Sequence, residues 1–246
     1  MPHTRAASIE PVTGSEMNAR LTATVRSELY EGRPLRILDA GCGRMWTWDL
    51  EEMRLELTGV DRDADALRLR AQERGDIDHW IVGDLRTVEL PPDSYDLVHC
   101  AYVLEHIHGA VDVLERMHEA LRPGGLMILK TPDRDSVYSF AARTTPHWLH
   151  VQYKRRIRGR KLAGTPGHGP YRVVYDQILS LPTLLDWAAA HQMDVITIVG
   201  ENEHLDFFGK AAPAVDHALR IVAAMSRKRL TATHTNVGLA MRKRWQ

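Results

Sequence analysis

The sequence predicts an α/β fold, in which a mostly parallel sheet carries helices on both faces. Short apolar segments of strand length alternate with helix-like segments through the first half of the chain. Strand–helix–strand repeats of this kind join parallel strands through right-handed crossovers. With 246 residues, of which 44% are hydrophobic, the chain is long enough to fill one large core.

Five segments of the first half have the length and apolar character of buried strands. They are Leu35–Ala40, Leu55–Asp61, His79–Val82, Asp96–Ala101 and Leu126–Thr131. Between them, Asp63–Arg74 and Gly109–Leu121 repeat apolar residues at helical spacing. The second of these helices is expected to end at Arg-Pro-Gly-Gly.

The second half of the chain is less regular. Residues 132–175 are expected to be irregular because glycine and proline are frequent there. Helices are expected at 16–30, 176–191 and 211–229, and strands at 195–199 and 237–241. No internal repeat or long polar linker is present, so the chain is expected to form a single domain, residues 1–246. That domain would carry an inserted cap at about 133–175 and a helical insert at about 203–235.

Composition excludes several classes of protein. The chain has 32 basic and 32 acidic residues, and this neutral balance argues against a general nucleic-acid coat protein and against a DNA partner. Two cysteines, Cys42 and Cys100, are too few for a disulfide framework or a cysteine zinc cage, so a reducing cytoplasm is expected. No apolar run reaches the ~20 residues of a membrane span, and the amino terminus lacks an apolar signal core.

The most informative motif is the glycine turn after the first strand, Leu38–Arg44 (LDAGCGR). Gly41 and Gly43 permit a tight turn and close approach to a ligand, although a plain strand-to-helix turn is the alternative. Trp46 occupies the position where a dinucleotide motif has its third glycine, and the Gly-Lys-Ser/Thr ending of a phosphate loop is absent. Asp39 would repel a pyrophosphate. It would attract S-adenosylmethionine, which carries a sulfonium and an ammonium.

Two further carboxylates follow the next strands. Asp61 comes about 20 residues after the glycines, the spacing at which a carboxylate accepts ribose hydroxyls. Asp84, in Gly83-Asp84-Leu85, follows the third strand, where it could accept a hydrogen bond from an adenine amino group. Loop capping or solvation is the alternative role for these acidic residues. Together with the glycine turn they favour a sulfur nucleoside site.

At this point the chain resembles a known family. Leu38–Arg44, Val60-Asp61, Gly83–Leu85, Tyr95–Ile107 and Leu121–Pro132 are similar to the ordered motifs of class I S-adenosylmethionine-dependent methyltransferases, over roughly residues 33–132. The resemblance implies a Rossmann-like three-layer sandwich with seven strands, the last antiparallel and inserted beside the sixth. The later half is similar to small bacterial methyltransferases that carry a basic insertion after the fifth strand.

The resemblance also implies which residues hold the cofactor, S-adenosylmethionine. Asp39 and the glycine turn would support the methionine group, Asp61 the ribose and Asp84 the adenine, while backbone around Cys100–Tyr102 would face the methionine. Met45 replaces a small residue of the family motif, which bears on cofactor affinity. The complete expected cofactor site is Asp39, Gly41, Cys42, Gly43, Asp61, Arg62, Asp84, Leu85, Cys100, Ala101 and Tyr102.

Two histidines are candidate catalytic residues. The cofactor supplies an activated methyl group, so the protein must position the acceptor and, for a hydroxyl or ammonium, remove a proton. His106 follows the fourth strand and His168 lies in the insertion, and histidine titrates near neutral pH. Either histidine could instead be structural. A metal site at Glu105–His108 is the less favoured alternative, so no metal is expected.

The insertion indicates an anionic acceptor. Residues 136–175 contain no Asp or Glu, and an electropositive cap over the site would attract a phosphate or carboxylate. A solvated helix face is the alternative. The basic residues are Arg143, Lys154, Arg155, Arg156, Arg158, Arg160, Lys161 and Arg172.

Three functions remain open. The leading hypothesis is a methyltransferase that acts on oxygen or nitrogen of a small or medium-sized acceptor, such as a metabolite, sugar or lipid-linked intermediate. The alternatives are an RNA methyltransferase and a catalytically silent partner protein that keeps the cofactor site. The apolar face of 214–225 could dock on the cap, on a second subunit of a homodimer or on a membrane surface, and docking within the protein is favoured.

Overall fold

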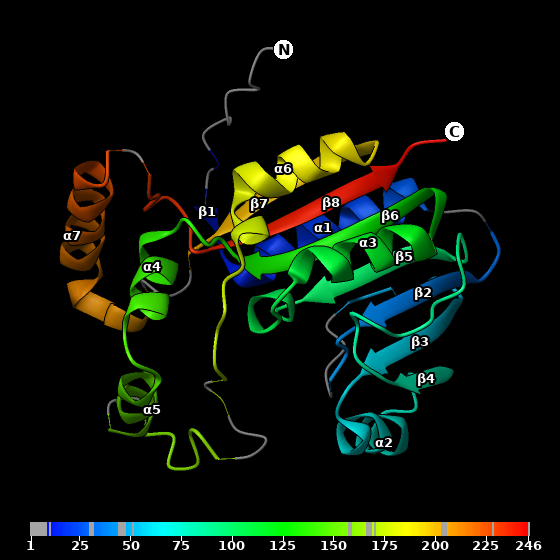
Figure 1. Ribbon diagram of the computed structural model, residues 1–246, viewed down its shortest axis with the longest axis horizontal. Helices are drawn as coiled ribbons and strands as arrows, with labels where there is room; N and C mark the ends of the chain where they lie inside the picture. Colours follow the sequence, from blue (N-terminus) through cyan, green and yellow to red (C-terminus); the bar gives the residue numbers. More distant parts are fainter. Residues whose placement is uncertain are drawn as a thin grey trace.

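The computed structural model describes residues 9, 11–29, 32–43, 48–50, 52–156, 159–165, 169, 171–202, 206–227 and 229–245, with the side chains of 206–208 excepted. A central sheet lies between two layers of helices, and helices α4, α5 and α7 stand beyond one end of the strands (Figure 1). This arrangement confirms the predicted three-layer α/β sandwich. In this part of the chain, no helix combines the length and the apolar character that crossing a membrane requires.

The sheet contains eight strands within the described residues, in the order β1-β7-β8-β6-β5-β2-β3-β4. All neighbours pair in parallel except β8, which runs antiparallel to both β6 and β7. The direction and place of the last long strand therefore agree with the prediction. The bounds are β1 Pro11–Val12, β2 Leu35–Ala40, β3 Leu55–Asp61, β4 His79–Val82, β5 Tyr95–Ala101, β6 Leu121–Pro132, β7 Met193–Glu201 and β8 Asn236–Lys243.

The predicted number of seven strands is one too low. The additional strand, β1, has two residues and pairs with Gly200 and Glu201 at the edge of the sheet. A two-residue strand shows no period-2 alternation, so the sequence carried no signal for it.

Helices cover the two faces of the sheet in pairs. On one face lie α1 (Gly14–Glu28) and α2 (Ala64–Glu73), and on the other lie α3 (Ala110–Ala120) and α6 (Leu181–Ala190). Side-chain oxygens begin three of them: Thr13 caps α1, Asp63 caps α2 and Ser180 caps α6. The predicted helix at 176–191 is divided at this last cap, because a short 3-10 turn (Gln177–Leu179) precedes Ser180.

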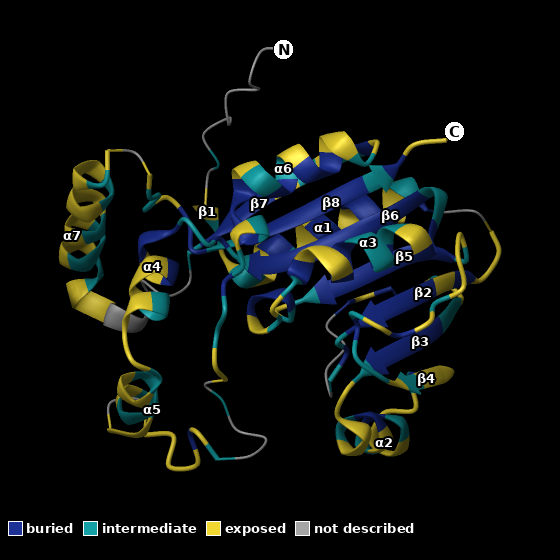
Figure 2. Cartoon of the chain, in the orientation of Figure 1, coloured by how far each residue is buried: buried dark blue, intermediate teal, exposed yellow. Residues whose placement is uncertain are grey.

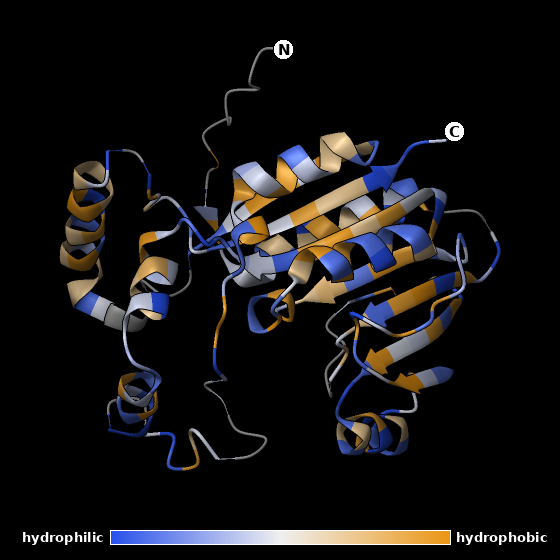
Figure 3. Ribbon diagram, viewed as in Figure 1, coloured by the Kyte–Doolittle hydropathy of each residue, from blue (hydrophilic) through white to orange (hydrophobic). Residues whose placement is uncertain are grey.

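The core follows from alternation along the strands. Leu38 and Val98 face the layer of α3 and α6, whereas their neighbours Ile37 and Leu97 face the layer of α1 and α2. The inner strands β2, β3, β5, β6 and β8 are accordingly buried over most of their length, as Figure 2 shows in dark blue, and they are largely apolar, as Figure 3 shows in orange. The edge strand β4 is mostly exposed.

The predicted irregular segment contains two helices, α4 (Val137–Thr144) and α5 (His147–Arg156). Ser136 begins α4 by accepting a hydrogen bond from the backbone N–H of Ser139. Since α5 buries none of its residues, it lacks the apolar spacing by which a helix is found in a sequence. Helix α7 (Ala212–Met225) lies beside α4 and is shorter than predicted. The single-domain organisation with two inserts stays a prediction.

Candidate functional site

Two adjoining cavities open where the parallel strands end. The inner cavity, of about 570 Å³, lies against α1 and is lined by Asp39, Lys130 and Glu201 among others. The outer cavity, of about 920 Å³, lies beside α2 and is lined by Asp61 and Asp84 among others. Both cavities share Gly41, Gly43 and Tyr102. The glycine turn thus forms the boundary between them.

The glycine turn requires glycine at its first position. Gly41 has φ +71°, and a Cβ there would lie 2.4 Å from a methyl carbon of Val103. Its N–H donates to the carbonyl oxygen of Val60 at 2.7 Å, which ties the turn to β3. Gly43 has φ +49°, and its N–H donates to Asp61 Oδ2 at 2.8 Å. The next residues of the motif, 44–47, which include Met45 and Trp46, lie outside the described residues.

Asp61, the residue predicted to bind the ribose, ends β3 at the wall of the outer cavity. One carboxylate oxygen accepts from Gly43 and the other accepts from the N–H of Asp63 at 2.9 Å. Because each carboxylate oxygen can accept about two hydrogen bonds, both retain capacity for a ligand hydroxyl. The side chain is therefore oriented by the protein and still able to bind.

Asp39 lies at the inner cavity, but its charge is balanced inside the protein. The carboxylate is 2% exposed, and it accepts hydrogen bonds from Arg70 Nη1 and His99 Nδ1, each at 2.8 Å. Asp39 is therefore not the unpaired anion that the sequence predicts, because Arg70 and His99 pair with it inside the protein. Arg70 was missed, although it occupies a position in α2 three residues after the buried Leu67, where an apolar residue would be expected.

Asp84 lies in the outer cavity, together with the predicted Arg62 and Leu85. Arg86 donates three hydrogen bonds to its carboxylate, from the backbone N–H, Nε and Nη2, at 3.0, 3.0 and 2.6 Å. The hydrogen bonds from the Arg86 side chain are the main reason why the pKa of Asp84 is far below its usual value. A ligand in this part of the outer cavity therefore contacts the Asp84–Arg86 ion pair. The sequence indicated only Asp84.

The two cysteines occupy different places. Cys42 lines the inner cavity, and burial raises the pKa of its thiol to about 12. Cys100 is 1% exposed and is not one of the described residues that line the two cavities. Ala101 and Tyr102, which follow it, do line the inner cavity. Both thiols are protonated at neutral pH, so neither acts as a nucleophile.

Lys130 is the main residue of the inner cavity that the sequence reasoning missed. It lies on β6, is 5% exposed, and donates from Nζ to Asn18 Oδ1 at 2.9 Å. Nζ is also 5.9 Å from the ring centre of Tyr102. Burial lowers the pKa of this ammonium. The available signal was a lysine within the apolar run LMILKT, where a charge needs a specific partner.

His106, one of the two predicted catalytic residues, lies in the outer cavity, on the short 3-10 turn Leu104–His106. Its Nδ1 is 2.7 Å from the carbonyl oxygen of Arg172, which can only accept, so Nδ1 carries the proton. Nε2 of the neutral ring then holds a lone pair and can accept a proton. The Tyr171 ring, on the chain that leaves the cap, meets the imidazole edge-on at 5.9 Å between ring centres. The second candidate base, His168, and the basic residue Arg158 lie outside the described residues.

The structure also bears on the alternative of a metal site at Glu105–His108. Across the described part of the chain, no group of three or more His, Cys, Asp and Glu side chains is placed to hold a metal ion. The neighbouring Glu105 is buried, and burial raises its pKa to about 8. A protonated carboxyl is a poor metal ligand at neutral pH.

Comparison with known proteins extends these observations. A family profile described as "Methyltransferase domain" matches residues 14–196. A malonyl-[acyl-carrier protein] O-methyltransferase of Enterobacter lignolyticus is 27% identical over 50% of this chain and 49% of its own length. A ubiquinone biosynthesis O-methyltransferase of Burkholderia vietnamiensis is 30% identical over 52% of this chain and 61% of its own length. The chain thus matches about half to three-fifths of these relatives.

A solved structure shows the same fold. It is the 1,6-didemethyltoxoflavin-N1-methyltransferase of Burkholderia thailandensis, with bound S-adenosylhomocysteine. The TM-score is 0.53 at 16% identity, and the match covers 94% of this chain and 80% of that one.

Proposed function

Because this chain belongs to the class I S-adenosylmethionine-dependent methyltransferase family, we propose that it methylates oxygen or nitrogen of a small or medium-sized anionic acceptor. The observation that carries the proposal is the pair of joined cavities at the strand ends, with Asp61 on one side of the glycine turn and Lys130 on the other. This order of groups suits a nucleoside that continues into an amino acid.

The residues of the outer cavity fit the nucleoside part of the cofactor. Asp61 would accept the ribose hydroxyls, and Leu85 with the Asp84–Arg86 pair would border the adenine. Gly41 lines this cavity with backbone alone, so a ligand can approach the turn closely, and the clash that a side chain would make with Val103 keeps the position a glycine.

The residues of the inner cavity fit the methionine part. That part carries an ammonium and a carboxylate, and the cavity offers both charge signs, Glu201 and Lys130, each nearly fully buried. Asp39, Ala101 and Tyr102 complete its wall. When bound, S-adenosylmethionine supplies a methyl group that its sulfonium has already activated.

The acceptor would meet His106 and the cap. His106 presents Nε2 as a proton acceptor for a hydroxyl or ammonium, at a wall that also includes Tyr171 of the chain leaving the cap. The basic cap favours an acceptor that carries a phosphate or carboxylate. Two relatives are named as O-methyltransferases and the structural neighbour as an N-methyltransferase, which supports oxygen or nitrogen as the methylated atom.

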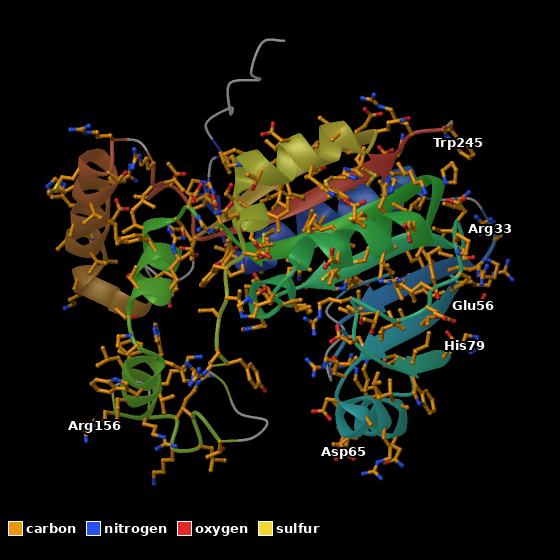
Figure 4. All side chains as sticks on the ribbon, viewed as in Figure 1. Arg33, Glu56, Asp65, His79, Arg156 and Trp245 are labelled. Atoms are coloured by element: carbon orange, nitrogen blue, oxygen red, sulfur yellow. The ribbon has the colours of Figure 1, made fainter. Side chains whose placement is uncertain are left out.

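Cofactor binding is tested with Asp61→Asn. The variant loses the anionic acceptor for the ribose, so we expect its affinity for S-adenosylhomocysteine in calorimetry to fall about 10- to 100-fold. Glu56→Gln is the matched control, because Glu56 belongs to the same strand but lies at its other end, away from the cavities (Figure 4). Absence of binding by the parent protein, or an equal loss in the control, would contradict the cofactor site.

The acceptor is sought separately, by incubating the protein with labelled S-adenosylmethionine and fractionated cell extract. We expect label in small anionic molecules detected by mass spectrometry. Label confined to RNA would favour the RNA methyltransferase, and a cofactor-binding protein without any methylated product would favour the silent partner.

A further inference from the structure

A third pocket, of about 760 Å³, lies between the cap and the helical insert. Its walls come from α4 with the residues just before it, and from the end of α7, two helices that lie side by side in Figure 1. None of its described lining residues lines the inner or the outer cavity. We call it the arginine pocket.

The arginine pocket carries an excess of positive charge. Four arginines line it, against a single carboxylate, Asp135, among the described lining residues. Asp135 Oδ1 lies 3.5 Å from Nη1 of one of them, Arg134. Burial, followed by the proximity of Arg134, lowers the pKa of the Arg143 guanidinium. The charge of an anion in the pocket would stabilise the guanidiniums and so offset both effects. The four arginines are Arg134, Arg143, Arg227 and Arg229.

Backbone hydrogen bonds hold the two walls together. The N–H of Val137, at the start of α4, donates to the carbonyl oxygen of Thr231 at 2.9 Å, and the N–H of Thr231 donates to that of Asp135 at 2.8 Å. Arg134 is fixed in turn, because its Nε donates to the carbonyl oxygen of Tyr175 at 2.9 Å. Arg134 is therefore held in place before any ligand arrives, which lowers the entropy cost of binding.

The same pocket has an apolar side. Phe140, Met225 and Leu230 line it, and the Met225 side chain is 78% exposed. The guanidinium of Arg143 lies over the Phe140 ring, 5.2 Å from its centre. Apolar side chains beside a cluster of guanidiniums match a molecule with a charged head and an apolar body.

We propose that the arginine pocket binds a phosphate group carried on an apolar chain, at a site separate from the methyl-transfer cavities. The planar guanidinium presents paired N–H donors that match phosphate oxygens, and several guanidiniums can surround one phosphate. The apolar wall then adds affinity in proportion to the buried area of the attached chain.

The proposal is tested by calorimetry with octyl phosphate, inorganic phosphate and octyl glucoside. Octyl phosphate is expected to bind at least about tenfold more tightly than inorganic phosphate, and the uncharged glucoside to give no measurable binding. The double variant Arg227→Gln/Arg229→Gln is expected to lose at least about tenfold in octyl phosphate affinity. Arg143→Gln, on the opposite wall, should show a loss in the same direction.

The matched control is Arg156→Gln/Arg160→Gln, which removes two charges from the cap outside the pocket. Arg156 projects from the far end of α5 into solvent (Figure 4). Equal losses in the two double variants would show diffuse attraction and overturn the site, as would tight binding of octyl glucoside or no binding of octyl phosphate by the parent. S-adenosylhomocysteine binding is also measured on every variant. Unchanged binding shows that a variant is folded with its cofactor site intact, so that a loss of octyl phosphate affinity is assigned to the arginine pocket.

Discussion

At the scale of single residues, arginine side chains neutralise two carboxylates of the site, Asp39 through Arg70 and Asp84 through Arg86. Asp61, Asp84 and the glycine turn follow strands, and parallel strands bring their carboxyl ends to one edge, so their convergence could be predicted. The partners of Asp39 could not, because Arg70 and His99 lie 31 and 60 positions from it along the chain. Arg86 lies only two residues after Asp84, so that pair was within reach of the sequence. Lys130 was missed although a lysine within an apolar strand is itself a signal of a buried charge.

Lys130 makes a prediction at this scale. If its ammonium pairs with the methionine carboxylate, Lys130→Met should weaken S-adenosylhomocysteine binding at least about tenfold, because that ion pair is desolvated. Methylthioadenosine lacks the amino acid group, so its affinity should change by less than about twofold. Calorimetry measures both, and Lys130→Arg should retain most of the affinity for S-adenosylhomocysteine. Equal losses of affinity for the two compounds would contradict the pairing of Lys130 with the methionine carboxylate.

At the scale of elements, α2 is fastened to the sheet by a buried ion pair. Arg70 is fully buried, and it bonds Asp39 of β2, the carbonyl oxygen of Cys42 at 3.1 Å and Asp76 at 3.1 Å. These bonds join the helix to the strand and turn on which the inner cavity rests. The pair therefore positions the turn as well as neutralising Asp39.

Removal of the Arg70–Asp39 ion pair should lower the stability of the fold. Arg70→Met leaves the Asp39 carboxylate buried without its guanidinium, so we expect a loss of about 3–5 kcal/mol in the free energy of unfolding, measured with urea. Arg70→Met/Asp39→Asn should recover part of the loss. Arg68→Met serves as the control, since Arg68 lies on the exposed side of the same helix in a surface pair, and should change stability by less than about 1 kcal/mol. Equal costs at the two positions would contradict the role of Arg70.

The elements themselves were predictable where they are buried. The bounds of β2 and β3 agree with the prediction, because apolar runs between polar turns mark strands covered on both sides. The bounds of β4 agree as well, although this edge strand is largely exposed. Helices α4 and α5 were not predicted. Their segment is rich in basic residues and, in α5, buries no side chain, so the hydrophobic period that identifies a helix is absent.

At the scale of the whole molecule, charge is segregated although the total is zero. Residues 136–175 hold eight basic and no acidic residues, so the remainder carries the excess of acid. Figure 2 shows that helices of the cap and insert are largely exposed on their outer sides, while the sheet is buried. The molecule therefore presents a basic surface beside a well-packed core.

Global stability should depend on pH through Glu105. An unfolded chain releases this proton near pH 4.5, whereas burial keeps the pKa at about 8 in the folded chain. The folded chain binds more protons between these values, so stability falls as pH rises through that window. Glu105→Gln mimics the protonated carboxyl. The variant should therefore exceed the parent by more than about 1 kcal/mol at pH 8.5 and match it closely near pH 4.5.

Urea unfolding at a series of pH values measures this difference. Other titrating groups are common to both proteins and cancel in the comparison. A difference that does not change with pH would show that Glu105 is already ionised in the folded chain at neutral pH.

The hydrogen bonds around Glu105 also have a mechanical result. Its carbonyl oxygen accepts hydrogen bonds from the N–H groups of Val174 at 2.7 Å and Tyr175 at 3.3 Å. The neighbouring His106 ring donates to the carbonyl oxygen of Arg172. Residues 172–175 are thus bound to the turn that carries Glu105 and His106. Because these hydrogen bonds join residues 172–175 to the turn that carries His106, a displacement of this stretch of chain would also move the imidazole. Under the proposed function, closure of the cap over an acceptor and alignment of the histidine that accepts its proton would then occur together.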